Sequence, residues 1–130
     1  KRIINENIEY KKRFREISYR LLDNHHKESI KGISFIWGIV DYVEKKQLTD
    51  KANELMKEKT LICFISRDVI ANIMIASSPD SGIDASTLLL KVLSDIGKGG
   101  GSKNIAFGSF PNNLCEKVIQ NIRNSLDISK

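Results

Sequence analysis

Residues 60–78 read TLICFISRDVIANIMIASS, and this stretch decides the fold. Two apolar runs, 60–66 and 72–78, flank Arg67 and Asp68, where the chain is expected to turn. The first run is almost continuously apolar, which is typical of a central strand covered on both faces. The two runs therefore predict an antiparallel hairpin at the centre of a buried sheet.

Helices and further strands are expected on both sides of this hairpin. Thr49 or Asp50 is the expected N-cap of the helix before it, and Asp84 caps the helix after it. In chain order, the expected elements are a helix at 2–24, a strand at 32–40, a helix at 48–59, the hairpin strands, a helix at 84–97, a strand at 104–110 and a helix at 111–126. This order, α-β-α-β-β-α-β-α, predicts an α/β domain with a mixed sheet flanked by helices, in which the helix-bearing connections make parallel crossovers.

The first helix is long and coiled-coil-like, because its apolar positions follow heptad spacing. The seam consists of Ile3, Asn7, Tyr10, Phe14, Ile17 and Leu21. Two interpretations stay open: the seam pairs with another helix, as in a homodimer, or it packs on its own domain. We assign residues 1–29 to a helical dimerisation segment, with His25 and His26 exposed at its helix end, and residues 30–130 to a globular domain.

The charge is uneven along the chain. Of the formal net charge of +5, the first 31 residues supply nine basic side chains against five acidic ones. A basic helix of this kind favours a polyanion such as nucleic acid, with Lys11, Lys12 and Arg15 as contact residues, although a solvated helix face would look similar.

The composition excludes several classes of protein. With 41% hydrophobic residues the chain can bury a core, and no apolar run is long enough to span a membrane. Cys63 and Cys115 lie in separate apolar stretches, which favours buried free thiols over a disulfide or a metal site. The start at Lys1, without a signal-peptide pattern, suggests a piece of a longer protein, and we expect it to be cytoplasmic.

The sequence holds no catalytic constellation. No His accompanies a Ser or Cys nucleophile motif, and the acidic residues lie on helix surfaces or at the ends of elements. We therefore expect a non-catalytic domain with no cofactor, no metal and no small-molecule substrate.

Residues 95–110, DIGKGGGSKNIAFGSF, hold five of the eight glycines. Such a cluster cradles a phosphate, lets two backbones pack closely or forms a slack linker. Its order, helix then glycines then strand, fails the P-loop and dinucleotide-binding patterns, which need a strand before and a helix after. Gly97-Lys98-Gly99-Gly100 fits the G-x-x-G of a KH domain, but a strand follows where that domain has a helix.

The stretch VLSDIGKGGGSKNIAFGSF (92–110) resembles the glycine-rich signature of the DHH-associated domain, in the form that ends alanyl-tRNA synthetases. Residues 97–101 match its Gly-Lys-Gly-Gly-Gly core, and Ala106 aligns with a family alanine. Ile96 replaces a glycine, and Ser102 stands where Arg is common. The phosphoesterase branch of the superfamily carries His at the position of Ser102. The resemblance covers about residues 30 to 125, and the helix before it is similar to the family's helical dimerisation part.

This resemblance implies a tRNA-binding and dimerisation domain of an alanyl-tRNA synthetase. Such a domain contacts the outer corner of tRNA, where the D and T loops meet, and supports aminoacylation and editing. The implied RNA-binding residues in the glycine cluster are Lys98, Gly99, Gly100, Gly101, Ser102, Lys103 and Asn104. The alternatives are the tail of a free-standing alanyl-tRNA editing hydrolase, the substrate-binding lobe of a DHH-type oligonucleotide phosphoesterase, and a purely structural dimerisation module.

Overall fold

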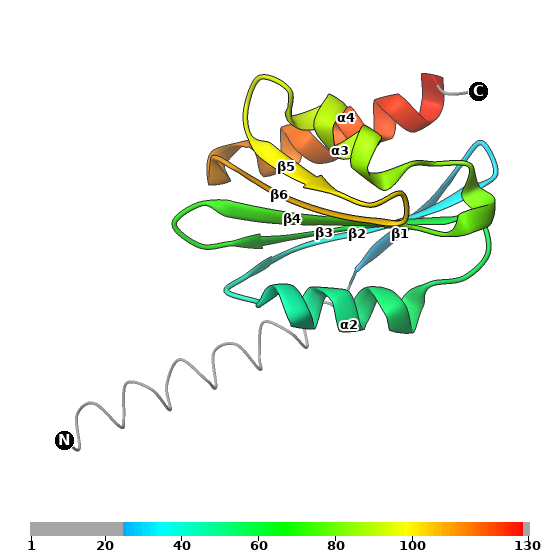
Figure 1. Cartoon of the computed structure of the whole chain (residues 1–130), viewed down its shortest axis with the longest axis horizontal. Helices are drawn as coiled ribbons and strands as arrows, with labels where there is room; N and C mark the ends of the chain where they lie inside the picture. The colour runs from blue at the N-terminus through cyan, green and yellow to red at the C-terminus, as the bar shows by residue number, and fades with distance from the viewer. Residues whose placement is uncertain (1–24, 129–130) are drawn as a thin grey trace, which may run out of the picture.

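The computed structural model describes residues 25–128, which form one six-stranded mixed sheet with helices on both faces (Figure 1). The strand order across the sheet is β1-β2-β3-β4-β6-β5. The strands are β1 His26–Ile30, β2 Ile33–Asp41, β3 Thr60–Arg67, β4 Ala71–Ser77, β5 Lys98–Gly101 and β6 Ile105–Phe110. The helices are α2 Lys45–Leu55, α3 Ala85–Leu93 and α4 Cys115–Ile128, with short 3-10 turns at Pro79–Ser81 and Asn112–Leu114.

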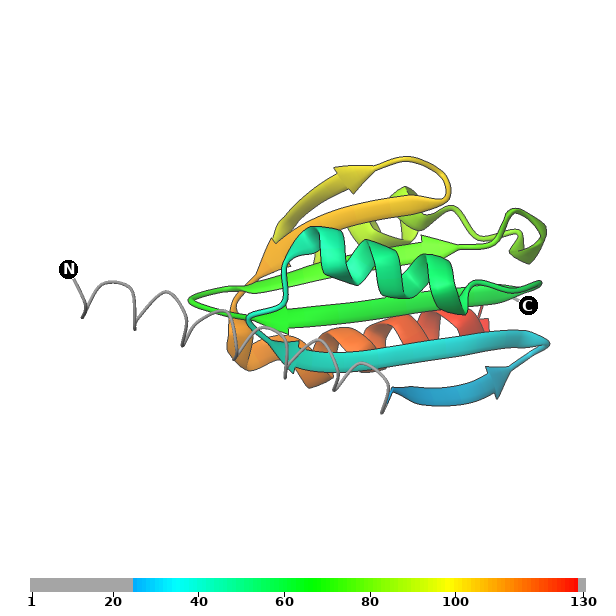
Figure 2. The same cartoon turned by 90° about the horizontal axis from the view of Figure 1, so that it is seen from below.

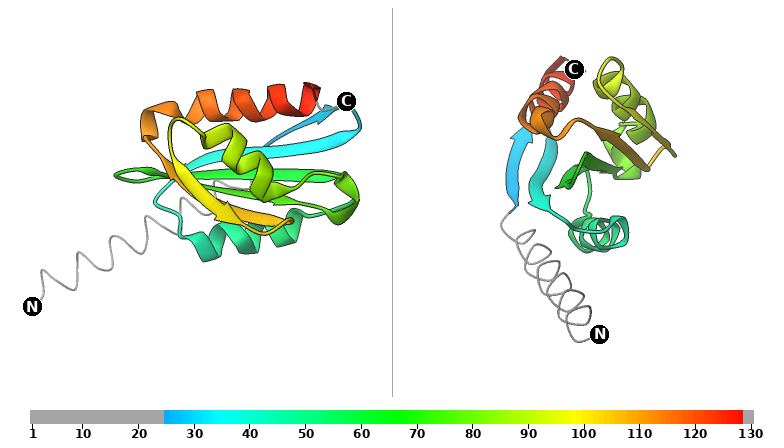
Figure 3. Two further views of the ribbon diagram at one scale, coloured as in Figure 1. Left: turned by 45° about the horizontal axis from the view of Figure 1, so that its top comes forward. Right: turned by 90° about the vertical axis from the view of Figure 1, so that its left-hand side faces the viewer.

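Each face of the sheet has its own hydrophobic core. Because successive side chains of a strand point to opposite faces, Leu61, Cys63 and Ile65 of β3 pack under α3 and α4, whereas Ile62 and Phe64 pack against α2. Figure 3 shows α3 and α4 on one side of the sheet and α2 on the other. All of these β3 side chains are fully buried, which explains why residues 60–66 are almost continuously apolar.

The predicted central hairpin is confirmed, since β3 and β4 pair in antiparallel register from Leu61–Ser77 to Arg67–Ala71. The α2 connection makes the expected parallel crossover between β2 and β3. The α3 connection differs from the prediction. It leads into β5, which runs in the same direction as β4, and β6 then returns between these two strands, antiparallel to both.

Two strands correct the predicted element order. Residues 26–30 form the edge strand β1, which spans the predicted domain boundary and joins β2 through a two-residue turn at Lys31 and Gly32, both with positive φ. His26 therefore belongs to the sheet, where its ring stacks on Trp37 with the centroids 4.2 Å apart. The second strand, β5, consists of Lys98 and three glycines, a composition with low strand propensity.

The start of α2 is also a correction. The helix begins at Lys45, with Glu44 as its N-cap, and not after Thr49 or Asp50. The backbone N–H of Glu44 donates to Oε1 of Gln47 at 3.2 Å, so the helix start is stabilised one turn earlier than the sequence suggests. Asp84 caps α3 as predicted and accepts a hydrogen bond from the N–H of Thr87 at 3.0 Å.

Both cysteines are buried free thiols, as predicted. Burial raises the pKa of the Cys63 thiol far above its ordinary value, and it raises that of Cys115 as well. Within residues 25–128, no helix is long and apolar enough to cross a bilayer. The predicted N-terminal helix and its seam, from Ile3 to Leu21, lie outside the described residues.

Candidate nucleic-acid interface

The glycine cluster forms a hairpin at one edge of the sheet. β5 pairs antiparallel with β6 from Lys98–Ser109 to Gly101–Ala106, and no described strand lies beyond β5. Figure 2, seen from the α2 face, shows this hairpin projecting past α2. The cluster is therefore an ordered edge strand and its turn, not a slack linker.

Close packing explains most of the glycines. A Cβ at Gly99 would lie 2.7 Å from Leu89 Cδ2 and 2.8 Å from the carbonyl oxygen of Phe107. A Cβ at Gly101 would lie 2.5 Å from Ala106 Cα, and side chains at Gly97 and Gly108 would meet backbone atoms as closely. Among the five glycines of the cluster, only Gly100 has open space, with nothing within 4 Å. Four of the five glycines thus let β5, β6 and α3 approach one another.

The outer edge of β5 presents backbone donors. The N–H of Ser102 bonds to the carbonyl of Ile105 at 2.8 Å, so Ser102–Ile105 is a hydrogen-bonded pair of the ladder. Because such pairs alternate along an antiparallel ladder, the N–H groups of Gly99 and Gly101 point away from β6. The exposed Lys98 and Lys103 stand on either side of these donors. We call this edge, Lys98–Gly101 together with Lys103, the glycine edge. Its donors and charges suit a phosphate backbone.

The turn residues are engaged within the protein. The hydroxyl of Ser102 accepts from the N–H of Ile105 at 3.3 Å, and the amide of Asn104 donates to the carbonyl of Ser77 at 3.1 Å. The carbonyl of Lys103 accepts from the N–H of Ala85 at 2.7 Å. These contacts hold the turn against β4 and the start of α3, while the exposed Lys103 stays accessible.

A polar row crosses the sheet from the glycine edge on the α2 face. Lys98 pairs with Ser109, and Ser109 pairs with Asn72, so the three side chains stand side by side on neighbouring strands. Phe107 lies on the same face of β6, and the ammonium of Lys45 on α2 sits 4.0 Å from its ring centroid. The sequence did not single out Lys45, Asn72, Phe107 or Ser109, because only the β4–β6–β5 register and the position of α2 over the sheet bring them together.

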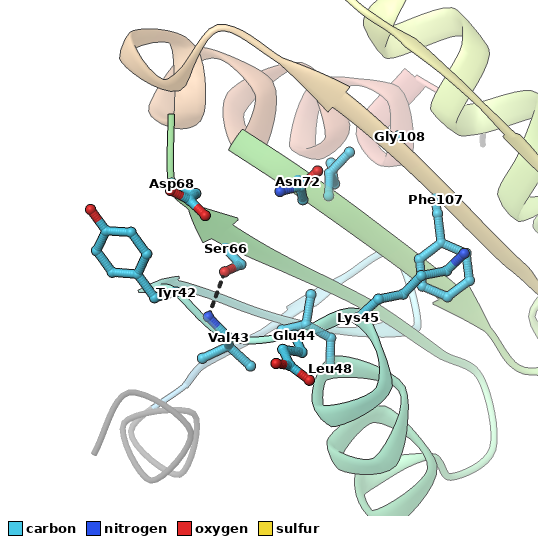
Figure 4. A pocket seen from close by; sticks show the side chains of 11 residues that line it. Tyr42, Val43, Glu44, Lys45, Leu48, Ser66, Asp68, Asn72, Phe107 and Gly108 are labelled. Atoms are coloured by element: carbon cyan, nitrogen blue, oxygen red, sulfur yellow. Dashed lines mark hydrogen bonds between the residues drawn. The ribbon is translucent and has the colours of Figure 1, made fainter. Parts of the chain in front are cut away.

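The polar row ends at a pocket of about 340 Å³ between the start of α2 and strands β3, β4 and β6 (Figure 4). We call it the Phe107 pocket. Its lining includes Tyr42, Lys45, Asp68, Asn72 and Phe107. With Glu44, which also lines it, the pocket offers two aromatic rings, a cation, an amide and two carboxylates within one concave surface.

Apolar side chains are exposed at the same end of the sheet. Val69 and Ile70, at the tip of the β3–β4 hairpin, are 89% and 47% exposed. They line a second hollow together with Lys98 and Ser109. The glycine edge is thus flanked by apolar surface at its Lys98 end.

Clustered metal ligands are absent from the described residues. This part of the chain contains no group of three or more His, Cys, Asp or Glu side chains that could hold a metal ion. The basic residues predicted on the first helix, Lys11, Lys12 and Arg15, lie outside the described range.

No family model and no curated protein matches the sequence, whereas solved structures do match the fold. The C-Ala domain of alanyl-tRNA synthetase from Aquifex aeolicus is 20% identical, with a TM-score of 0.73, over 78% of this chain and 98% of that domain. RecJ from Thermus thermophilus, solved with Mg²⁺, is 12% identical with a TM-score of 0.59, over 90% of this chain and 18% of its own. The pGpG-specific phosphodiesterase PggH from Vibrio cholerae is 10% identical with a TM-score of 0.54, over 98% of this chain and 43% of its own.

The chain therefore has the fold of a C-Ala domain, as its glycine-rich signature predicts. It spans nearly all of that domain but less than half of either RecJ or PggH.

Proposed function

We propose that this domain binds tRNA as part of an alanyl-tRNA synthetase, contacting the outer corner where the D and T loops meet. It is non-catalytic itself and supports aminoacylation and editing by holding the tRNA, in the cytoplasm and without a cofactor. One observation carries the proposal: the fold covers 98% of the C-Ala domain of such an enzyme at a TM-score of 0.73.

The glycine edge supports this role physically. It combines two outward N–H groups, at Gly99 and Gly101, with two exposed lysines on one ridge of the molecule. The extended strand runs from Lys98 to Gly101, which is about 10 Å, and Lys103 follows in the turn of the same hairpin. A nucleic-acid strand running along this edge can therefore meet both ammonium groups and the amides between them.

The test compares a transcript of tRNA(Ala) with a transcript of equal length whose D and T loops are altered so that they cannot meet. We expect the intact tRNA to bind about tenfold more tightly, a difference of ~1.4 kcal/mol, in a filter-binding titration. Equal charge and length remove the non-specific electrostatic contribution from the comparison. Equal affinity for the two transcripts would contradict the corner contact. Affinity no higher than for DNA of the same length would contradict the tRNA-binding role.

The N-terminal seam is proposed to make the homodimer. Phe14→Asp places a charge in the middle of the seam, so we expect the dimer to dissociate in sedimentation velocity at micromolar concentration. Ser18→Asp, one residue past a seam position, introduces the same charge outside the seam and leaves the dimer intact. A fully dimeric Phe14→Asp variant would remove the seam from the interface and favour its packing on the chain's own domain.

A second candidate is the substrate-binding lobe of a DHH-type phosphoesterase, because RecJ and PggH share the fold. Ser102, at the turn of the β5–β6 hairpin, occupies the position where that branch carries His, which favours the synthetase interpretation. The tail of a free-standing editing hydrolase shares all the proposed contacts. The sequence upstream of Lys1 separates these parents: a synthetase core, an editing domain or a DHH motif.

A further inference from the structure

The Phe107 pocket combines aromatic and polar groups that phosphate contacts at the glycine edge do not use. Figure 4 shows Tyr42 and Phe107 on opposite sides of the pocket, with Ser66 and Asn72 between them. Its volume, about 340 Å³, lies at the lower end of the range for ligand sites and suits a group as small as one nucleoside.

Tyr42 is held in a conformation that bulky residues rarely adopt. Its φ is 56°, in the left-handed region, and its N–H bonds to the carbonyl of Arg67 at 3.0 Å. The next residue is fixed as well, because the N–H of Val43 donates to Oγ of Ser66 at 2.8 Å. Tyr42 is nevertheless 49% exposed. Local strain of this kind concentrates at binding sites, and here it keeps an aromatic ring at the rim of the pocket.

Phe107 offers a ring face whose present occupant can move. The ammonium of Lys45 lies 4.0 Å from the centroid of the Phe107 ring. This face of the ring therefore contacts a cation and not the hydrophobic core. Lys45 is the first residue of α2, and both Lys45 and Phe107 retain solvent contact. A flat base can stack on the ring in place of the ammonium, which is then free to contact the attached phosphate.

Asn72 supplies hydrogen-bonding capacity beside the ring. Its side-chain amide makes no hydrogen bond within the described part of the chain, and the residue is exposed. In the sheet it pairs with Ser109, which continues the polar row to Lys98. An amide offers a donor and an acceptor side by side, which matches the edge of a nucleobase.

We propose that the Phe107 pocket binds one unpaired nucleobase of the RNA whose backbone runs along the glycine edge. The proposal rests on the RNA-binding function given above and extends it from backbone contact to base contact. The base stacks on Phe107 beside Tyr42, and the amide of Asn72 bonds to its edge. Lys45 neutralises the neighbouring phosphate. Recognition of splayed bases on aromatic side chains is the common mode of single-stranded RNA binding.

The test uses the whole chain and fluorescently labelled hexanucleotides of A, C and U, with an abasic ribose-phosphate hexamer of the same charge as reference. We expect at least one base-bearing hexamer to bind about tenfold more tightly than the abasic hexamer in fluorescence anisotropy. Phe107→Leu keeps an apolar side chain but removes the ring, so we expect it to abolish this difference. Asn72→Ala, an exposed change that leaves the core intact, should reduce the difference severalfold. Asn113→Ala, at another exposed asparagine, is the matched control and leaves it unchanged.

Three results would overturn the pocket assignment: equal binding of base-bearing and abasic hexamers, a preserved difference in both Phe107→Leu and Asn72→Ala, or an equal loss in Asn113→Ala. Competition by free nucleoside monophosphates at the hexamer's own concentration would assign the pocket to a free nucleotide and overturn the RNA-base proposal. The tRNA proposal fails separately. Tight tRNA binding without base selectivity removes only the pocket, whereas base selectivity without recognition of the tRNA corner removes only the tRNA role.

Discussion

Replacing Lys98 and Lys103 together by alanine is expected to lower the affinity for tRNA roughly 25- to 60-fold at about 0.1 M salt. Each lysine that neutralises a phosphate contributes a factor of about 5 to 8 at that salt relative to 1 M, because counterions are released when the contact forms. Both lysines are exposed and neither takes part in an ion pair within residues 25–128, so their removal leaves the fold intact.

The salt dependence provides the sharper readout. The plot of log affinity against log salt has a negative slope, and its magnitude should decrease by about 1.5 in the double variant, since two phosphate contacts are lost. The control is Lys27→Ala with Lys57→Ala, which removes the same charge near the opposite edge of the sheet. If both double variants weaken binding equally, the effect is one of net charge and the glycine edge has no specific role. An unchanged affinity in Lys98→Ala/Lys103→Ala would exclude the glycine edge as the RNA contact.

Gly101→Ala is expected to lower the free energy of unfolding by about 1–3 kcal/mol. The new methyl group would lie 2.5 Å from both Ala106 Cα and the carbonyl oxygen of Ile105. These are backbone atoms of the paired strand, so they cannot rotate away as a flexible side chain would, and the hairpin must shift. Urea denaturation followed by circular dichroism measures the change.

Gly100→Ala is the matched control, one residue away on the same strand. Its Cβ enters open space, and Gly100 does not have a positive φ, so we expect stability to stay equal or rise by about 0.5 kcal/mol. Equal destabilisation of the two variants would mean that β5 tolerates no side chain for reasons other than packing. Gly100 is the one glycine of the cluster at 97–108 with an open side, so it also tests close approach of RNA. If RNA contacts that side, Gly100→Ala weakens binding without loss of stability.

The centre of the sheet could be predicted because the apolar residue types there directly indicate that their positions are buried. Leu61 to Ile65 of β3 are completely buried, so nearly every position in that strand must be apolar whatever the rest of the chain does. The apolar stripe of α4 is similar, since Val118, Ile119 and Ile122 face the core at helical spacing. In these segments local pattern and tertiary environment agree.

The two edge strands could not be predicted, because their residues carry no such signal. β1 contains exposed and charged residues, as edge strands often do, and it is positioned by its tight turn and by the bond of Arg123 to Glu28 at 2.6 Å. β5 has one lysine and three glycines, and its pairing with β6 beneath α3 makes it a strand.

The sequence by itself determined the α/β class, the central hairpin, the buried thiols and the likeness of residues 92–110 to the signature of a tRNA-binding domain. Local composition is sufficient for these, because burial selects residue types position by position. The tertiary structure decided that the glycines allow close packing of β5, β6 and α3, and it decided which side chains lie next to them. Gly99 and Gly101 are required by contacts with Leu89, Ala106 and Phe107, which lie on other elements. The polar row depends on the register in which β4, β6 and β5 pair, and the Phe107 pocket forms where the start of α2 lies over these strands. Strand register depends on long-range packing, which no local stretch of sequence encodes.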